Sequence, residues 1–293
     1  MKKLSNKEVV YTMSKDNPPV LAIESGERVY LETLDCFSNQ IKKEEDKVGE
    51  IDFARVNPGT GPIYVKDANP GDVLKVTIHR IDLKEQGVSI VSPGMGLLPN
   101  KITEEVSVII PVRDKKIHFR NYEFPITPMV GVIGTAPKGE PVPTGYPGTH
   151  GGNMDCPRIT EGAVVYLPVD VPGALFAAGD LHAAMGDGEV SISGVEISGG
   201  IDLTLEILKD VDIPTPSVHS QGTYSYITTD HSPMVASQKA VEGMVSYVSK
   251  VLELTFEESL MLLSDVGILR YCSTGDAFTV TRMEFPDTYF TLP

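Results

Sequence analysis

The sequence Ile201-Asp-Leu-Thr-Leu-Glu-Ile-Leu208 alternates apolar and polar residues, as in a β-strand with one face in the core. The alternation places Asp202, Thr204 and Glu206 on the solvent face. The segment 163–170 is apolar on both faces, which predicts a central, buried strand. Further alternating runs predict strands at residues 28–35, 72–79 and 190–197. The chain is therefore expected to be mainly β.

The C-terminal part of the chain carries helical signals instead. Apolar residues between 241 and 252 recur at spacings of three and four, and Thr255-Phe-Glu-Glu258 has the form of a capping box. These patterns predict two helices near the C-terminus. We expect a single unit over residues 1–293, with a β-rich core at 1–210 that holds the site and a helix-containing closing region at 211–293.

Composition limits the classes of partner and of compartment. The 293 residues carry a formal net charge of -15, which argues against nucleic-acid binding because such binding needs clustered Lys and Arg. No apolar run approaches the ~20 residues that span a membrane, and the start has none of signal-peptide length. Three widely spaced cysteines form neither a disulfide framework nor a CxxC zinc motif. These features predict a cytoplasmic protein without a membrane or nucleic-acid partner.

The glycine-rich stretch 149–200 concentrates histidines and carboxylates on expected loops. Asp180 and His182 are two residues apart, so in an extended segment both side chains leave from one face and can reach one cation. His150 and Asp155 flank a pair of glycines, which allows a loop to fold closely around an ion. A single loop histidine is more often structural, but two with neighbouring carboxylates favour metal ligation. The stretch predicts a metal-centred hydrolytic site.

Glu196 and Asp35 each interrupt the apolar face of an expected strand. In the run 190–197, Glu196 shares its face with Val190 and Ile192, and burying a carboxylate without a partner is costly. Asp35 interrupts the apolar face of its own strand in the same way. Two inward carboxylates from distant strands could meet at one site. The alternative is a solvated strand end, or a buried carboxylate paired with backbone donors.

Cys156 is an alternative nucleophile, since a thiolate can carry out hydrolysis through a covalent intermediate without a metal. Its acidic neighbour, Asp155, predicts a raised pKa of the Cys156 thiol, which disfavours the thiolate. Arg158 either stabilises an oxyanion or pairs with a carboxylate, and ion pairing is the commoner role of a single arginine. The chain has no Gly-Gly-Ser-Ser-Gly stretch of the serine amidases, no phosphate loop and no dinucleotide fingerprint.

At these residues the sequence resembles the acetamidase/formamidase family. The segments that carry the resemblance are 18–27, 32–35, 57–62, 150–155, 166–176, 179–189 and 194–196. The run Gly-Asp-Leu-His-Ala-Ala-Met-Gly-Asp-Gly-Glu at 179–189, after His-Gly-Gly-Asn-Met-Asp at 150–155, is the most specific part. The sequence departs from the family pattern at 219–231, which bears on substrate selection, and at Ser14-Lys-Asp-Asn17.

The resemblance implies a hydrolase that cleaves short linear amides, of the acetamide or formamide type, to a carboxylate and ammonia. It also implies a mostly β fold with sandwich and barrel-like parts and a smaller α/β region. A bound divalent metal, usually zinc, and a homo-oligomer of two or more subunits are further expectations. Carried over by position, the resemblance points to Asp35, His150, Asp155, Asp180, His182, Glu189 and Glu196.

The resulting hypothesis for the mechanism has two parts. The expected metal ligands are Asp35, His150, Asp155, Asp180 and His182, with zinc as the ion and an additional calcium ion left open. The expected general base, which takes a proton from water and passes it to the leaving nitrogen, is Glu196 or Glu189. Two alternatives remain: a metal-dependent hydrolase of another amide or an ester, and a non-catalytic β-sandwich binding module stabilised by a cation.

Overall fold

The computed structural model describes residues 1–274, 277–290 and 292–293, and most of its regular elements are strands. The strands are β1 (Lys2–Leu4), β2 (Val9–Val10), β3 (Thr12–Met13), β4 (Leu21–Ile23), β5 (Glu27–Thr33), β6 (Gly59–Val65), β7 (Val73–Val91), β8 (Val106–Arg113), β9 (Lys116–Phe119), β10 (Tyr122–Pro125), β11 (Met129–Gly134), β12 (Val142–Pro143), β13 (Gly151–Asn153), β14 (Val164–Pro168), β15 (Phe176–His182), β16 (Glu196–Leu208), β17 (Ser217–Ser220), β18 (Thr223–Asp230), β19 (Ile268–Ser273) and β20 (Thr279–Pro286). The helices are α1 (Pro233–Leu252) and α2 (Phe256–Val266), and short 3-10 turns occur at Val48–Glu50, Phe53–Arg55 and Asp287–Tyr289. The expected mainly β fold with two helices near the C-terminus is confirmed.

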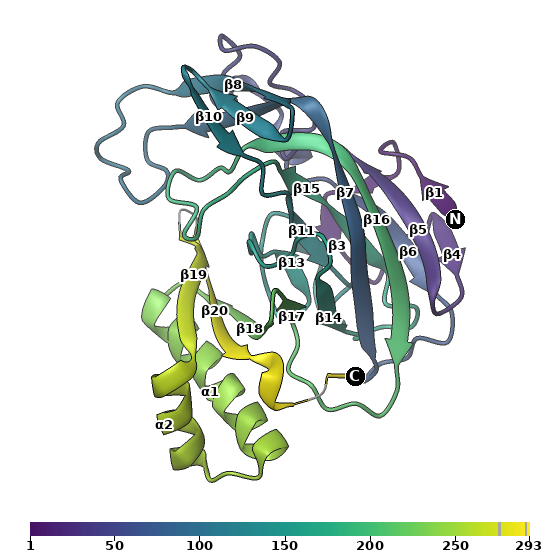
Figure 1. Ribbon diagram of the computed structural model, residues 1–293. Coiled ribbons are helices and arrows are strands. Elements are labelled where there is room, and N and C mark those ends of the chain that lie inside the picture. Colours follow the sequence, from purple (N-terminus) through teal and green to yellow (C-terminus); the bar gives the residue numbers. More distant parts are fainter. Residues whose placement is uncertain (275–276, 291) are drawn as a thin grey trace.

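The sheet is built around two long antiparallel strands, β7 and β16, which run side by side down the molecule in Figure 1. β16 also pairs with β5, and β7 pairs with β8 and β14. A closed barrel needs a ring of hydrogen-bonded strands that returns to its first strand. The pairings of the described strands branch outward from β7 and β16 and form no such ring, so these strands do not close into a barrel. Ile201, Leu203 and Leu205 are fully buried, and a one-residue slip of β16 would turn them to the other face.

Most predicted strands are confirmed, but the one at residues 190–197 is wrong. Residues 28–35, 72–79, 163–170 and 201–208 contribute to β5, β7, β14 and β16. In contrast, β16 begins only at Glu196, and the residues before it form an irregular loop. Val190 is 60% exposed, and Ile192 has a φ of 90°, which no extended strand adopts. Glu196 is buried, but not because it shares a strand face with Val190 and Ile192.

Asp202 lies on the solvent face that the alternation of β16 predicts, where the side chain of Glu206 is 46% exposed, but its own carboxylate is covered there. It is 3% exposed, and Arg28 on β5 donates from Nε and Nη2 to its two carboxylate oxygens at 2.7 and 2.8 Å. The bidentate pair explains why the carboxylate is tolerated at this position, since both of its oxygens accept a charge-assisted hydrogen bond.

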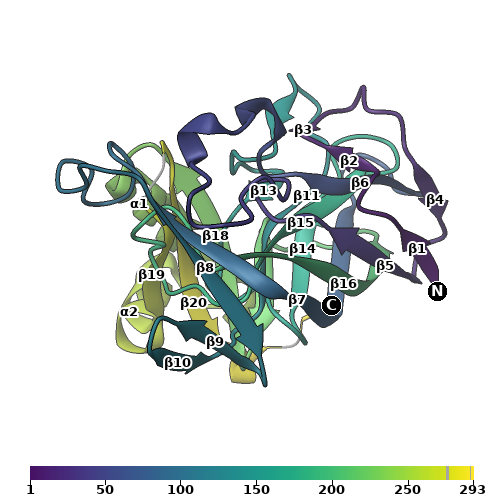
Figure 2. The ribbon, with the colours of Figure 1, turned by 90° about the horizontal axis from the view of Figure 1, so that it is seen from above.

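Helices α1 and α2 cover the C-terminal strands at one end of the molecule, as Figures 1 and 2 show. α1 packs against β18 and β20, and α2 packs against α1. α2 begins with the predicted capping box: Thr255 Oγ1 accepts from Glu258 N at 3.2 Å, and Glu258 Oε2 accepts from Thr255 N at 2.9 Å. In the part of the chain that the structure describes, no helix is long and apolar enough to cross a membrane.

Candidate functional site

Four of the predicted site residues converge where β11, β13, β15 and β16 meet. Asp180 and His182 lie at the end of β15, and His182 is directly opposite Glu196, the first residue of β16. Asp155 follows β13 by two residues, and β11 lies between β13 and β15. Strand pairing therefore brings together side chains from three separate segments of the chain.

The ring of His182 is surrounded by three carboxylates. Its Nε2 lies 3.1 Å from Glu196 Oε2, 3.4 Å from Asp180 Oδ1 and 3.8 Å from Asp155 Oδ1. These four side chains are at most 4% exposed, so the charges interact in a medium of low dielectric constant. Burial alone would lower the pKa of His182, but the charges of Glu196 and Asp180 outweigh it and raise that pKa well above its usual value.

Two sets of three side chains have ligand atoms within 4.8 Å of one another, as a bound metal ion requires. The sets are Asp155, His182 and Glu189, and Cys36, Asp180 and Glu196. Cys36 lies in the segment after β5, and the sequence did not predict it as a site residue. The one local feature that pointed to it was its position next to the candidate ligand Asp35. Burial raises the pKa of the Cys36 thiol well above its usual value, and the charges of nearby carboxylates add to this shift.

Three buried carboxylate oxygens of the cluster share one positive neighbour. Asp155 Oδ1, Asp180 Oδ1 and Glu196 Oε2 accept no hydrogen bond of good geometry from the described residues, and all three face the same His182 Nε2 at 3.1–3.8 Å. Burial raises the pKa of Glu196 to about 8. Burial also raises the pKa of Asp155 well above its usual value, and the charge of Glu189 adds to this. A divalent cation would supply both the charge and the partners that these oxygens lack, so the residues fit a metal site.

The close approach of two of these carboxylates depends on Gly131 in β11. A Cβ at this position would lie 2.5 Å from Asp155 Oδ1 and 2.8 Å from Asp180 Oδ2, closer than real contacts allow. Asp155, Asp180 and Glu189 have φ values of 41°, 55° and 41°, which are uncommon for residues other than glycine. Backbone strain of this kind gathers at functional sites. Sequence reasoning could not find Gly131, because an isolated glycine in a strand carries no signal of its neighbours.

The structure places Asp35 and His150 outside both sets of ligand atoms. Asp35 Oδ1 accepts a hydrogen bond from Asn39 N at 2.6 Å. Burial, with a smaller contribution from the charge of Asp180, raises the pKa of Asp35 to about 6. His150 is 2% exposed, its Nε2 has no partner in the described chain, and burial lowers its pKa to about 4. Metal ligation by these two residues stays a prediction.

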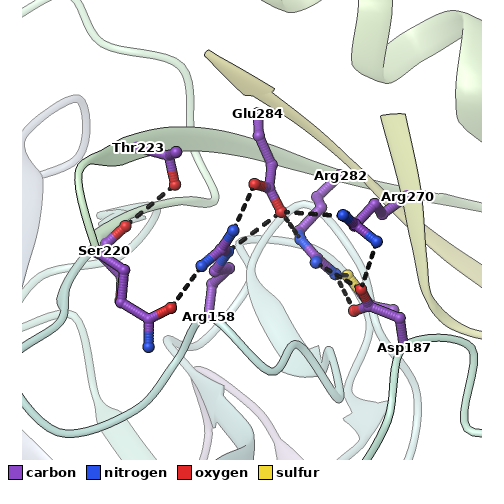
Figure 3. A network of polar contacts seen from close by, with 9 residues as sticks. Arg158, Asp187, Ser220, Thr223, Arg270, Arg282 and Glu284 are labelled. Atoms are coloured by element: carbon purple, nitrogen blue, oxygen red, sulfur yellow. Dashed lines mark hydrogen bonds and ion pairs between the residues drawn. The ribbon is translucent and has the colours of Figure 1, made fainter. Parts of the chain in front are cut away.

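Cys156 and Arg158 serve other contacts. Cys156 is fully buried and belongs to neither set of ligand atoms. Burial raises the pKa of its thiol, but a hydrogen bond with Cys272 and the charge of Arg282 outweigh burial, so the pKa is lowered rather than raised. Arg158 donates from Nε and Nη2 to the carboxylate of Glu284 at 3.1 and 2.7 Å, which is the ion-pair role (Figure 3).

A pocket of about 280 Å³ opens onto the cluster. One end is polar, because the carboxylates of both sets, His182 and Asn153 line it. The remaining wall is largely apolar, and its lining residues are Cys36, Phe37, Val48, Phe53, Val56, Asn57, Ile90, Met95, Gly145, Tyr146 and Ile192. A small concave site with polar groups gathered at one end is typical of the binding of a small organic molecule.

The sequence profile of the acetamidase/formamidase family matches the chain over residues 3–142 and 139–264. The protein belongs to the acetamidase/formamidase family. The resemblance of the motifs at 150–155 and 179–189 is thereby confirmed, and the buried cluster of this family member is built from residues of those motifs and of Gly194–Glu196.

Solved structures match this member of the family over nearly its whole length. An acetamidase of Bacillus halodurans is 40% identical, with a TM-score of 0.96 over 98% of both chains. A predicted acetamidase/formamidase of Thermoanaerobacter tengcongensis is 41% identical, with a TM-score of 0.95 over 98% of this chain and 95% of that one. A putative formamidase of Schizosaccharomyces pombe is 28% identical over 257 residues. That alignment covers 67% of this chain, which spans 63% of the relative's length.

We expect Gly131→Ala to weaken the binding of a divalent metal ion, with zinc as the probe, by roughly tenfold or more, because the added Cβ displaces the carboxylates of Asp155 and Asp180. Titration calorimetry of the metal-free protein measures the affinity, and circular dichroism checks folding. Gly139→Ala is the control, since a Cβ there meets no atom within 4 Å. Equal zinc affinities of the two folded variants would contradict the role of Gly131.

Proposed function

We propose that the protein hydrolyses the C–N bond of small linear amides, of the acetamide or formamide type, to a carboxylate and ammonia. The observation that carries this proposal is the buried cluster around His182. Three of its carboxylates share His182 as a positive neighbour, and they line a pocket of small-molecule size. Membership of the family and the names of the acetamidase and formamidase relatives support the same reaction.

Asp155 and His182 would hold a divalent metal ion, with Glu189 as the third member of their set and Asp180 Oδ1 3.4 Å from the same His182 nitrogen. Cys36 belongs to the second set, with Asp180 and Glu196. Imidazole nitrogen and thiolate sulfur favour zinc over calcium, because calcium prefers oxygen ligands. A bound zinc ion would polarise a carbonyl oxygen and lower the pKa of water towards about 7.

Glu196 is the proposed general base. Gly194 N–H donates to its Oε1 at 2.9 Å, which leaves Oε2 beside His182 at the polar end of the pocket. A carboxylate held in this way can accept a proton from the attacking water and pass it to the leaving nitrogen. Glu189 also lines the pocket and is the alternative base.

Chelation tests the dependence on a metal. Removal of the ion is expected to abolish ammonia release from acetamide and formamide, and added zinc is expected to restore it, because the carbonyl is otherwise unactivated. Mass spectrometry of the purified protein identifies the ion. Activity that survives complete removal of metal would favour a nucleophile such as Cys156. Calcium as the sole ion, without ammonia release, would favour the binding module.

Glu196→Gln tests the base. The variant retains the size of the side chain, so fold and zinc content are expected to persist while kcat on acetamide falls by roughly 10²–10⁴-fold. Glu206→Gln is the matched control, because Glu206 is on the same strand with a side chain 46% exposed. A Glu196→Gln variant that retains zinc and turns over at the parent rate would reject this role.

The alternative function is hydrolysis of another amide or of an ester, since a metal cluster does not by itself select the substrate. Parallel assays with a lactam and a short ester distinguish it from the proposed reaction. A homo-oligomeric assembly, a cytoplasmic location and an additional calcium ion also stay predictions.

A further inference from the structure

The pocket beside the cluster is larger than acetamide or formamide requires. Its volume of about 280 Å³ is close to the lower end of the range of sites for drug-sized ligands, roughly 300–1,000 Å³. Acetamide has four non-hydrogen atoms and formamide has three. The apolar side chains of the wall include Phe37, Val48, Phe53, Val56, Ile90, Met95 and Ile192.

Ile192 is held in this wall against its own backbone preference. Its φ of 90° is rare for any residue except glycine and is a clear outlier for a β-branched one. Hydrogen bonds on both sides enforce the conformation: Ile192 N donates to Glu189 O at 3.1 Å, and Ile90 N donates to Ser193 Oγ at 3.0 Å. Strain that the surroundings enforce in this way is characteristic of ligand sites.

A primary amide has polar atoms only at its carboxamide end, so this end pairs with the cluster and the acyl chain lies along the apolar wall. We propose that the pocket selects amides with longer apolar acyl chains, such as those of butyramide and hexanamide, over acetamide and formamide. This inference rests on the proposed amide hydrolysis and adds the class of acyl group.

The test compares kcat/KM for formamide, acetamide, butyramide and hexanamide. Each buried methylene is expected to raise kcat/KM roughly three- to fourfold, so hexanamide gains about a hundredfold over acetamide. Calorimetry with the same amides measures the preference without turnover. A flat or falling series in both measurements overturns the acyl pocket and leaves amide hydrolysis intact. Tighter binding of hexanamide without ammonia release retains the pocket and rejects the hydrolysis.

Ile192→Ala shortens the wall and is expected to lower the ratio of hexanamide to acetamide kcat/KM, and of their binding constants, roughly tenfold. Val190→Ala is the matched control, because Val190 is in the same loop, is 60% exposed and does not line the pocket. A ratio that is equal in the two variants would overturn the role of Ile192.

A chain of ion pairs carries a second, independent inference, because it connects the loops of Asp155 and Glu189 (Figure 3). Arg282 and Glu284 form its centre. They are two residues apart on β20, their side chains are 3% and 1% exposed, and Arg282 donates from Nε to Glu284 Oε1 at 2.6 Å. The centre of the chain is therefore as deeply buried as the site itself.

The Arg282 end holds the loop of Glu189. Arg282 donates from Nη1 and Nη2 to the two carboxylate oxygens of Asp187 at 2.6 and 3.0 Å, and Asp187 is two residues before Glu189. The backbone of the same loop is bonded to β19, since Gly188 N donates to Cys272 O at 3.0 Å. Side-chain and main-chain contacts thus fix this loop to the C-terminal strands.

The Glu284 end holds the loop of Asp155. Glu284 accepts from two nitrogens of Arg158 at 3.1 and 2.7 Å, and Arg158 is three residues after Asp155. Burial would raise the pKa of Glu284, but the hydrogen bonds from Arg158 and Arg282 outweigh it and lower that pKa. Bidentate pairs constrain direction as well as distance.

We propose that Arg282 and Glu284 are positioning residues that set the spacing of Asp155 and Glu189, which belong to one set of candidate ligands. The stability of the fold does not by itself explain a buried chain of ion pairs, because apolar residues of similar volume often stabilise a protein at least as well. This inference rests on the proposed metal site.

Arg282→Met and Asp187→Asn test the positioning role through zinc affinity. Arg282→Met leaves Glu284 paired with Arg158, and Asp187 is 32% exposed, so neither variant creates an isolated buried charge. We expect each to bind zinc roughly tenfold or more weakly in calorimetry of the metal-free protein. Amide hydrogen exchange over residues 183–195 is expected to accelerate. Arg282→Lys retains the positive charge but loses the two guanidinium donors that bind Asp187 together. This variant should bind zinc more tightly than Arg282→Met.

Arg28→Met is the matched control, because it breaks another bidentate pair, with the buried Asp202. Asp202 lies six residues beyond Glu196 on β16, on the order of 20 Å from the site. The Arg28→Met variant should therefore bind zinc with the affinity of the parent protein. Zinc affinities equal to the parent's in Arg282→Met and Asp187→Asn, or a parent protein that binds no zinc, would overturn the inference. Zinc binding that responds as expected without amide hydrolysis would reject only the proposed reaction.

Discussion

The crowding of negative charge around His182 is the interaction on which the rest of this structure depends. Asp155, Asp180, Glu189 and Glu196 are all at most 8% exposed, and three of them lie within 3.8 Å of one imidazole nitrogen. Repulsion between such charges is strong at low dielectric constant, so the cluster requires protons or a cation to persist. Within the cluster, His182 Nε2 compensates only part of this charge, because three carboxylate oxygens share it and none of them accepts a hydrogen bond of good geometry from the described residues.

Three features of the surrounding fold hold these side chains in place: strand pairing, a glycine in β11 and a chain of ion pairs. Pairing of β15 with β16 sets His182 opposite Glu196, and Gly131 of β11 leaves space for two carboxylates. The chain of ion pairs through β20 ties together the loops that carry Asp155 and Glu189. The apolar wall of the pocket faces the remaining side, so a substrate meets charge at one end and hydrocarbon at the other.

Much of the fold was predictable because strands and helices have short-range signatures. Alternation over 201–208 and the capping box at Thr255 are local patterns, and both elements form where they were expected. The strand predicted at 190–197 was wrong because alternation over a few residues also occurs in loops. The burial of Asp202 was missed because its partner, Arg28, is 174 residues away in the sequence and only strand pairing brings them together.

The sequence by itself determined the mainly β class and the family motifs. It also suggested that Asp180 and His182 lie together, as they do at 3.4 Å, although Asp180 has a φ of 55° and so is not in the extended conformation on which that expectation rested. Only the tertiary structure decided that Cys36 and Gly131 lie at the cluster while His150 stays outside both sets of ligand atoms. The physical reason is that these contacts join strands and loops that are distant in the sequence. Local periodicity reports which face of a strand is buried, but it carries no information about which strands will be neighbours.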